Sequence, residues 1–402
     1  MIMEQVIKRY LNLLRVTQIS FVRDMMQRIN WSDRLIAVRG QRGVGKTTLM
    51  LQRIKMEFGD HDAQTVIYAS LDNIYFATHN LLEFIEQFYQ YGGKYVFLDE
   101  VHKYPNWSRE IKNAYDEFPD LHIIFTGSSL INILNAEADL SRRCITYDMQ
   151  GLSFREYLLM FKGQKFPVAS LEDICTKPNE ICSEVARRIR PLQYFQEYLH
   201  KGYYPFLAEG EETYYIRIEN MVNLTIDTEL PQLRQLDVAN VRKIKALLEV
   251  LASGLPMQVD ATKLSKMAEI SRNTLLQYLQ HLDAARIIRL LYSDSLSVKR
   301  LQKPDKIYLD NPNMHYALSA NDVNAGTIRE TFFVNQLSYA HGVEYANGAA
   351  DFTVDHDATF EVGGRAKDGK QIAGEAKAFI AADDEEYAFG NKIPLWLFGF
   401  LY

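Results

Sequence analysis

The sequence has few cysteines and no long apolar run, and each shortage argues against a class of protein. Its three cysteines, Cys144, Cys175 and Cys182, form neither a C-x-x-C pair nor zinc-finger spacing, which argues against a disulfide framework and a structural zinc site. No stretch approaches the roughly 18 apolar residues that cross a bilayer. The N-terminal MIMEQVIKRYLNLLRV mixes charged and apolar side chains and does not have the apolar centre of a signal peptide. We therefore expect a cytoplasmic protein with no membrane partner.

A bulk excess of positive charge is also missing. The chain has 45 basic and 51 acidic residues and a net charge of -6, which argues against a protein that coats nucleic acid over its whole surface. A local basic patch is compatible with this average. With 402 residues, 47% of them apolar, the chain is typical of a globular protein. At the usual domain size it contains about two to four domains.

The strongest motif is a phosphate-binding loop near the N-terminus. An apolar strand over 35–39 runs directly into GQRGVGKT at 40–47, which is G-x-x-x-x-G-K-T. Glycines let successive backbone N–H groups face a phosphate, and the following helix presents its positive N-terminus to the same anion. Lys46 is expected to reach the β- and γ-phosphates of ATP, and Thr47 to be a Mg²⁺ ligand. The expected nucleotide-binding residues are Gly40, Gln41, Arg42, Gly43, Val44, Gly45, Lys46, Thr47 and Thr48.

A second motif, YVFLDE at 95–100, is an apolar strand that ends in two carboxylates. Asp99 is expected to hold Mg²⁺ through water, beside the ligand Thr47, and Glu100 to polarise an attacking water. Taken alone, two acids at the end of a strand are equally typical of a solvated turn. Their combination with a phosphate-binding loop favours the catalytic interpretation.

Further apolar runs at 65–69 and 123–126 complete a predicted parallel sheet, with helical stretches between the strands. This alternation predicts a doubly wound α/β domain. Ligands of such domains bind at the carboxyl ends of the strands, where Thr126 and Ser128 follow the last run. Ser128 is expected to lie close to a γ-phosphate, although a serine there is equally suited to cap the next helix.

Several stretches together resemble the AAA+-type P-loop ATPases of a prokaryotic family that carries an uncharacterised C-terminal domain. They are GQRGVGKTT, YVFLDEVHKYPNW, IIFTGSS and SRRCITYDMQGLSFREYL. The resemblance implies that Ser128 is the nucleotide sensor, with Thr126 as the other choice. It also implies that Arg143 matches the arginine of an L-x-G-R pattern, in which Arg142 here replaces the glycine. Such an arginine acts on the γ-phosphate in cis or from a neighbouring subunit. A structural salt bridge is the alternative role.

A helix-turn-helix pattern lies between residues 260 and 292. One helix is expected to open at 262, and Ser271 is expected to cap a second helix that buries the leucines between 275 and 282. Strands at 287–291 and 306–309 are expected to form the wing of a winged helix. Residues 261–303 contain eight basic and three acidic side chains, which suits contact with phosphates. The candidates for reading base edges of double-stranded DNA are Arg272, Asn273 and Gln277. The alternative is a winged helix that packs internally or docks protein.

The C-terminal part contains three acids in the order of a restriction-endonuclease-like core. Glu330 lies in a predicted helix, and Asp351 and Glu361 lie in predicted strands. Such enzymes bind Mg²⁺ with the acids and place a lysine close by. Gly363 occupies the position expected for that lysine, and Lys377 is a candidate substitute. Residues 351–402 also carry ten acids against five bases, which disfavours DNA. We therefore expect a domain that has lost nuclease activity.

The predicted organisation has four parts. They are an AAA+-type ATPase domain at 1–150, a helical lid at 151–240, a winged helix-turn-helix at 241–310 and the restriction-endonuclease-like α/β domain at 311–402. The expected catalytic residues are Lys46, Glu100, Ser128 and Arg143, with ATP and Mg²⁺ as cofactors. The expected function is ATP hydrolysis coupled to a winged helix that contacts DNA. Two alternatives are a nucleotide-switched regulatory or scaffold protein without DNA binding and an ATPase-fused metal-dependent nuclease. A protein partner or a homo-oligomer is compatible with each.

Overall fold

The computed structural model describes residues 2–60, 62–130, 140, 142–234, 236–254, 257–258, 260–293, 303–319, 323–346, 350–367 and 377–402. These residues form two compact units, Met1–Gly151 and Leu152–Tyr402, each of which is described by itself. No helix within the described ranges is both long enough and apolar enough to cross a membrane.

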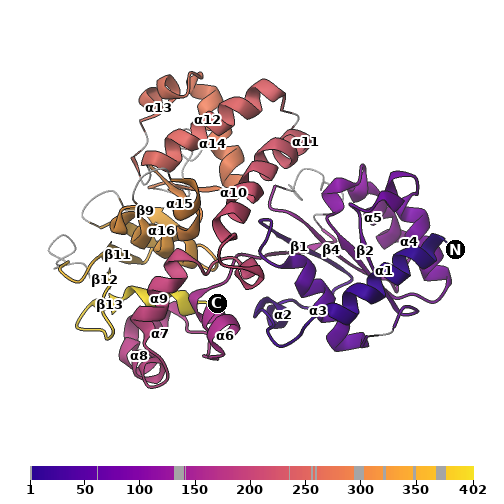
Figure 1. The fold of residues 1–402 in the computed structure, drawn as a ribbon, viewed down its shortest axis with the longest axis horizontal. Helices are drawn as coiled ribbons and strands as arrows, with labels where there is room; N and C mark the ends of the chain where they lie inside the picture. Colours follow the sequence, from indigo (N-terminus) through magenta and orange to yellow (C-terminus); the bar gives the residue numbers. More distant parts are fainter. Residues whose placement is uncertain are drawn as a thin grey trace. The chain divides into compact units, whose positions relative to one another are not determined.

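The first unit is built on a five-stranded parallel sheet with the strand order β2-β3-β4-β1-β5 (Figure 1). Its strands are β1 (Leu35–Gly40), β2 (Val66–Ser70), β3 (Tyr95–Asp99), β4 (His122–Ser128) and β5 (Ile145–Asp148). The predicted α/β class is confirmed, as are the four strands expected from apolar runs. The fifth strand, β5, was not predicted. Its residues are half-buried or exposed, so no apolar run marks it.

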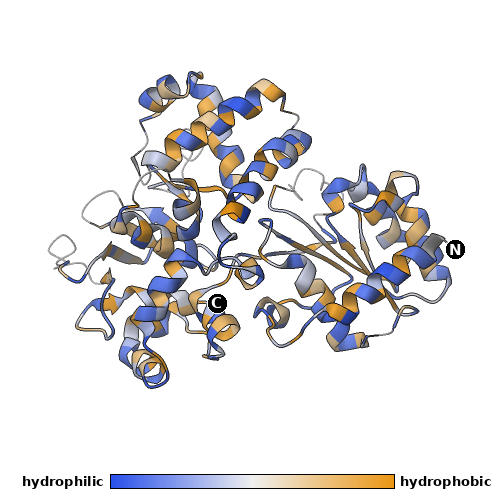
Figure 2. Cartoon of the chain, viewed as in Figure 1, coloured by the Kyte–Doolittle hydropathy of each residue, from blue (hydrophilic) through white to orange (hydrophobic). Residues whose placement is uncertain are grey.

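Helices pack on this sheet and bury one face each. They are α1 (Ile2–Val16), α2 (Met25–Arg28), α3 (Lys46–Phe58), α4 (Leu81–Gln90) and α5 (Trp107–Glu117), with short turns η1 (Ile74–Ala77) and η2 (Val101–Lys103). Figure 2 shows hydrophobic and hydrophilic residues alternating along these helices, as expected where one side faces a core. The core joins the strands to α4 and α5 through residues such as Ile85, Ile111 and Phe125. This packing fixes the carboxyl ends of β1, β3 and β4 beside one another.

The second unit begins with helices. They are α6 (Phe154–Lys162), α7 (Leu171–Thr176), α8 (Pro178–Ala186), α9 (Pro191–His200), α10 (Tyr214–Leu224) and α11 (Leu230–Arg234), with η3 (Pro205–Glu209) and η4 (Thr225–Glu229). Ser153 caps α6 in a reciprocal pair with Glu156, which explains why the helix begins there. The aromatic residues of this stretch are core: Phe154, Phe195 and Tyr198 pack together with Phe332 of the C-terminal part.

The region predicted to contain a helix-turn-helix follows, with helices α12 (Val238–Gly254), α13 (Ala261–Met267) and α14 (Arg272–Ala284). The Ser271 hydroxyl accepts a hydrogen bond from the amide of Thr274 at 3.2 Å and so starts α14. A three-stranded antiparallel sheet in the order β6-β8-β7 accompanies these helices. Its strands are β6 (Met257–Gln258), β7 (Ile288–Leu291) and β8 (Lys306–Leu309).

The C-terminal part combines helices with a mixed five-stranded sheet in the order β13-β12-β11-β10-β9. Its elements are α15 (Pro312–Leu318), α16 (Ala325–Leu337), β9 (Val343–Tyr345), β10 (Phe352–Val354), β11 (Ala358–Gly363), β12 (Ala378–Ala382), β13 (Lys392–Pro394) and η7 (Leu395–Phe400). Strands β9 to β11 pair antiparallel, whereas β11 to β13 pair parallel. One core unites this sheet with α6 and α9, so the whole of 152–402 is a single unit.

Candidate nucleotide site

The phosphate-binding loop connects β1 to α3 and depends on its glycines. Gly43 and Gly45 have φ values of 82° and 100°, in the left-handed region that favours glycine. A Cβ atom at Gly40 would lie 2.2 Å from the carbonyl oxygen of Met149, so no larger residue fits there. Helix α3 starts at Lys46, directly after Gly45. The loop therefore aims the N-terminus of α3 at the carboxyl edge of the sheet, as anion binding requires.

Lys46 and Thr47 lie at the start of α3 and already have polar partners. The Lys46 ammonium donates to the carbonyl oxygens of Gly40 and Gln41 at 2.8 and 2.9 Å, and the side chain is buried. The Thr47 hydroxyl donates to a carboxylate oxygen of Asp99 at 2.6 Å. The two sequence motifs, separated by 52 residues, therefore meet in one site.

The Asp99 carboxylate at the end of β3 accepts hydrogen bonds from three hydroxyl groups. Besides Thr47, it accepts from Tyr68 of β2 at 2.8 Å and from Thr126 of β4. Burial and the neighbouring Asp99 both raise the pKa of Tyr68, so this phenol stays a neutral donor. Hydroxyl groups from two neighbouring strands and from the phosphate-binding loop thus fix the orientation of the carboxylate.

Glu100 follows β3 in an unusual backbone conformation. Its φ of 55° and ψ of 42° are left-handed, and its amide donates to the Thr126 hydroxyl at 3.2 Å. The carboxylate is 22% exposed, and one of its oxygens lies 3.4 Å from Nε2 of His102. A partly exposed acid next to the phosphate-binding loop is suited to bind and polarise water.

Ser128 and Arg143, the other two expected catalytic residues, have different positions. Ser128 ends β4 directly beside Gly40, so it lies at the start of the phosphate-binding loop. Its hydroxyl also accepts from the amide of Leu130 at 3.4 Å, and the helix that it was expected to cap falls mainly in 131–139, outside the described residues. Arg143 precedes β5, whose first residue pairs with Ile36 at the other end of β1, and it binds Asp116 with two hydrogen bonds of 2.9 and 3.2 Å. This placement matches the salt-bridge alternative and does not bring Arg143 to the loop of its own chain.

Three residues of this site escaped the sequence analysis: Tyr68, His102 and Arg23. The Arg23 guanidinium is buried and donates to the carbonyl oxygens of Val44, Gln150 and Gly151, all at 2.9 Å. It therefore ties the phosphate-binding loop to the end of the first unit. His102 is the only one with a local signal, because it lies two residues after Glu100.

The three candidates for base contacts are all exposed on α14, near its N-terminus: Arg272, Asn273 and Gln277. Leu275, Leu279 and Leu282 of the same helix are buried, so the candidates lie on its solvent face.

The number of basic residues available for phosphate contact in this region needs one correction. Arg289 is buried and lies 3.0 Å from Asp310, so its charge is neutralised inside the unit. Residues 294–302, with Lys299 and Arg300, are outside the described residues.

The three C-terminal acids also come together, in a group that we call the acid–lysine cluster. It consists of Glu330 on α16, Asp351 before β10, Glu361 on β11 and the side chains of Lys306 and Lys367. Lys306 lies 2.6 Å from Glu330, and Lys367 lies 2.8 Å from Glu361. Burial and the nearby Glu330 raise the pKa of Asp351, although the Val362 amide and the two lysines oppose this.

Neither lysine of this cluster is the one proposed from sequence. Lys377 instead binds Asp357 at 2.6 and 2.7 Å on the surface. The substitute is Lys367, which lies in the turn after β11 and reaches back to Glu361. Among the residues that the structure describes, no three acids, histidines or cysteines are arranged to hold a metal ion.

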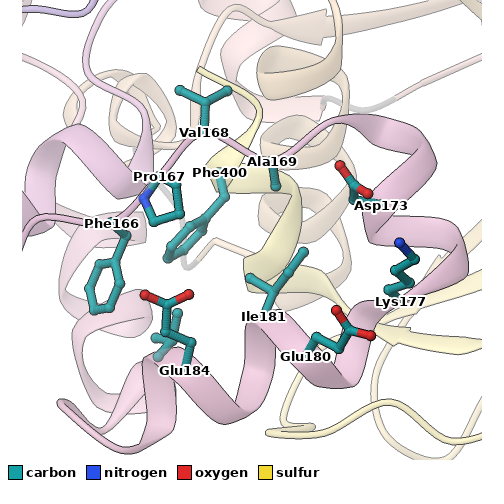
Figure 3. Close-up of a pocket in the computed structure, with 11 residues that line it drawn as sticks. Phe166, Pro167, Val168, Ala169, Asp173, Lys177, Glu180, Ile181, Glu184 and Phe400 are labelled. Atoms are coloured by element: carbon teal, nitrogen blue, oxygen red, sulfur yellow. The ribbon is translucent and has the colours of Figure 1, made fainter.

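A cavity of about 210 Å³ lies elsewhere in the second unit, between the 166–169 segment and helices α7 and α8 (Figure 3). Apolar side chains such as Phe166, Ile181 and Phe400 line it together with the charged Asp173, Lys177 and Glu180. It contains none of the predicted site residues.

Two stretches of the chain match known families. Residues 32–158 match a family described as an AAA domain, and residues 192–324 match a family described as a domain of unknown function. The first match contains both nucleotide motifs and the Asp99 network. Residues 32–158 are thus similar to an AAA domain, and they include the phosphate-binding loop.

The chain is also similar to whole proteins. Uncharacterized protein MJ1637 of Methanocaldococcus jannaschii is 26% identical over 412 residues, which cover 92% of this chain and 85% of the relative. Uncharacterized protein MJ1544 of the same organism is 24% identical over 332 residues, covering 78% and 69%. Among solved structures, the Aeropyrum pernix ORC1 protein in complex with DNA is 12% identical with a TM-score of 0.30, covering 82% of this chain and 91% of that one. AMPPCP-bound DnaA from Aquifex aeolicus is 14% identical with a TM-score of 0.25, covering 65% and 84%.

Proposed function

We propose that this protein is an AAA+-type ATPase that binds ATP with Mg²⁺ and hydrolyses it to ADP and phosphate. The observation that carries the proposal is the 2.6 Å hydrogen bond between Thr47 and Asp99. It joins the hydroxyl of the phosphate-binding loop to the carboxylate at the end of β3, which is the ligand pair that a P-loop ATPase uses for Mg²⁺. Left-handed glycines and a buried lysine beside this pair complete a cradle for a triphosphate.

Each residue has a distinct task in this reaction. Lys46 exchanges its bonds to Gly40 and Gln41 for phosphate oxygens, which have more negative charge than carbonyl oxygens. Thr47 and Asp99 are the oxygen donors that suit a bound Mg²⁺, and the ion would neutralise charge that develops on the phosphates. The Glu100 carboxylate orients a water molecule and accepts its proton. Ser128, at the start of the loop, is the proposed sensor of the γ-phosphate.

The test separates binding from turnover. Lys46→Ala is expected to weaken ATP binding, because the main cation of the loop is lost. Glu100→Gln is expected to keep ATP binding and to lower the turnover number by roughly 10²- to 10⁴-fold, the usual contribution of a general base. Phosphate release and the binding of a fluorescent ATP analogue are the measurements. Glu117→Gln, the same change at an exposed position of α5, is the control and is expected to hydrolyse ATP normally. Turnover by Glu100→Gln at the unmutated rate would show the proposed role to be wrong.

We further propose that the region 241–310 is a winged helix and that α14 contacts double-stranded DNA. Support comes from the exposed Arg272, Asn273 and Gln277 on its solvent face and from Lys263 and Lys266, exposed on α13. Basic side chains on consecutive helices of such a motif neutralise phosphates, and amide side chains near the N-terminus of the second helix suit base edges.

One observation favours a second candidate, the nucleotide-switched regulatory protein. Arg143 binds Asp116 and does not reach the phosphate-binding loop of its own chain. If a neighbouring subunit of a homo-oligomer must supply the arginine, an isolated chain holds ATP and hydrolyses it slowly. Turnover that duplex DNA accelerates supports the coupled ATPase, whereas turnover that is indifferent to DNA supports the switch.

For the C-terminal domain we propose a restriction-endonuclease-like fold without nuclease activity. The ion pairs of Glu330 with Lys306 and of Glu361 with Lys367 support this assignment. Each lysine already neutralises an acid that a nuclease needs for its metal ion. In this proposal the acid–lysine cluster stabilises the fold and does not cleave DNA.

A further inference from the structure

We infer that His102 is a positioning residue that holds the Glu100 carboxylate in the orientation needed to polarise water. The inference rests on the proposed ATPase function and assigns a further residue to its site. His102 lies in η2, the short turn that directly follows β3 and Glu100. No part of the P-loop pattern requires a histidine there.

The geometry around His102 is restrictive. Its side chain is only 1% exposed, and Nε2 lies 3.4 Å from a carboxylate oxygen of Glu100. The neighbouring Val101 is fully buried in the core of the first unit, so the turn that carries the imidazole is anchored. A ring that is fixed by packing is a rigid partner for a more exposed carboxylate.

Glu100 needs such a partner because its backbone alone does not orient the side chain. The left-handed conformation at φ 55° turns the residue out of the strand direction, and the bond from its amide to Thr126 fixes the main chain. The carboxylate itself lies beyond three rotatable bonds and is 22% exposed, so water competes for it. Asp99, by contrast, is held by three hydroxyls. In the proposed role, the imidazole Nε2, which lies 3.4 Å from the Glu100 carboxylate, donates to it and supplies the corresponding restraint for the general base.

A neutral imidazole suits this role. In the tautomer that carries its proton on Nε2, the ring places an N–H donor 3.4 Å from the carboxylate and leaves the acid negatively charged. A donor of fixed position lowers the cost of ordering the carboxylate before the reaction, which favours turnover without changing how ATP is bound. The predicted signature is therefore a change in kcat with little change in KM.

The experiment compares His102→Leu, His102→Gln and His102→Asn with the unmutated full-length chain. Leucine fills much of the space without a donor, glutamine restores an N–H donor, and asparagine is polar but shorter. We expect His102→Leu to lower kcat by about 10- to 100-fold, the usual effect of removing a supporting hydrogen-bond partner. His102→Gln should recover most of that loss. Binding of a fluorescent ATP analogue should stay within about twofold for all three, since no variant removes a phosphate contact.

A double-mutant comparison distinguishes positioning from general destabilisation. In the Glu100→Gln background, His102→Leu should cause little further loss, because the group that it orients is already removed. Thermal unfolding checks each variant, and His102→Asn replaces His102→Leu in the comparison if the latter does not fold.

The outcomes separate this inference from the proposed function. If the unmutated protein hydrolyses ATP, Glu100→Gln is slow and His102→Leu keeps the normal kcat, the positioning role is wrong and the ATPase proposal survives. The positioning role is also wrong if His102→Leu lowers kcat by the same factor in the unmutated chain and in the Glu100→Gln background. If the unmutated protein does not hydrolyse ATP, both proposals fail together.

Discussion

Tyr68 is the residue whose importance is least visible in the sequence. It lies on β2, outside both nucleotide motifs, and its hydroxyl donates to Asp99 at 2.8 Å. A carboxylate that shares hydrogen bonds with three hydroxyls keeps one orientation, and partners of this kind tune how tightly a metal ion is held. Tyr68 is therefore expected to act on Mg²⁺ through Asp99.

The substitution Tyr68→Phe tests this role, because it removes the hydroxyl and keeps the ring in the core. We expect the Mg²⁺ concentration for half-maximal ATP hydrolysis to rise by about tenfold. Tyr95→Phe is the matched control, since Tyr95 lies at the opposite end of the neighbouring strand β3. Hydrolysis is measured in a titration with MgCl₂. An unchanged titration curve for Tyr68→Phe would show that the hydroxyl has no part in metal binding.

Sequence reasoning at this scale works where a site is contiguous. Lys46, Thr47, Asp99 and Glu100 stand in short motifs whose spacing reflects one turn or one strand end. Tyr68 lies 31 residues from Asp99, and Arg23 lies 21 residues from Val44. Their roles depend on strand order and on loop closure, which a spacing pattern does not contain. Lys367 was missed for a related reason. The E-x-K pattern expects a lysine two residues after Glu361, whereas Lys367 comes later in the chain and a turn brings it back to Glu361.

At the scale of secondary-structure elements, the apolar pattern predicts those strands that are buried on both faces of the sheet. β1, β3 and β4 are almost fully buried, and each was visible as an apolar run. β5 is an edge strand with the burial pattern exposed, half-buried, half-buried, exposed, so its sequence ITYD has no such signal. Ser271, the residue directly before α14, shows that a cap residue is a better guide than the apolar pattern to where a helix begins.

The buried pair of Arg289 and Asp310 is an element-scale feature with a measurable consequence. Arg289 lies on β7 and Asp310 follows β8, and their side chains are 5% and 1% exposed. The carbonyl of Asp310 also accepts from Asn335 of α16 at 2.8 Å. The pair thus links the three-stranded sheet to the C-terminal part of the second unit. Isolated charges are costly in such surroundings, so each partner depends on the other.

We expect Arg289→Met to lower the free energy of unfolding by about 3–5 kcal/mol, because it leaves the Asp310 carboxylate buried without its cation. Urea unfolding followed by circular dichroism is the measurement. Arg289→Met combined with Asp310→Asn should recover a large part of the loss, since the uncompensated charge is removed. Arg242→Met, at an exposed position of α12, is the control and should change stability by less than about 0.5 kcal/mol. A loss for Arg289→Met as small as that of the control would contradict the argument.

At the scale of the whole molecule, the net charge of -6 conceals an uneven distribution. Exposed cations lie on α13 and α14, whereas the turns beside the C-terminal sheet carry exposed acids, among them Asp355, Asp357 and Asp384. The net negative charge gives such a chain no general attraction to nucleic acid. The surface of α13 and α14 is therefore the place to test DNA binding. If ATP hydrolysis in one unit is coupled to DNA contact in the other, DNA must change the rate of ATP hydrolysis.

We therefore expect duplex DNA to raise the rate of ATP hydrolysis, and low salt to enlarge the effect because phosphate contacts release counterions. Arg272→Ala should weaken DNA binding by about 1–3 kcal/mol, the value for a lost base contact. Arg242→Ala removes one exposed positive charge from α12 and is the matched control. Fluorescence anisotropy and phosphate release measured in the same buffers connect binding to turnover. If DNA binds and turnover stays constant, the coupling is wrong. If Arg272→Ala and Arg242→Ala bind DNA equally well, α14 is not the contact, and the nucleotide-switched alternative becomes the better account of this chain.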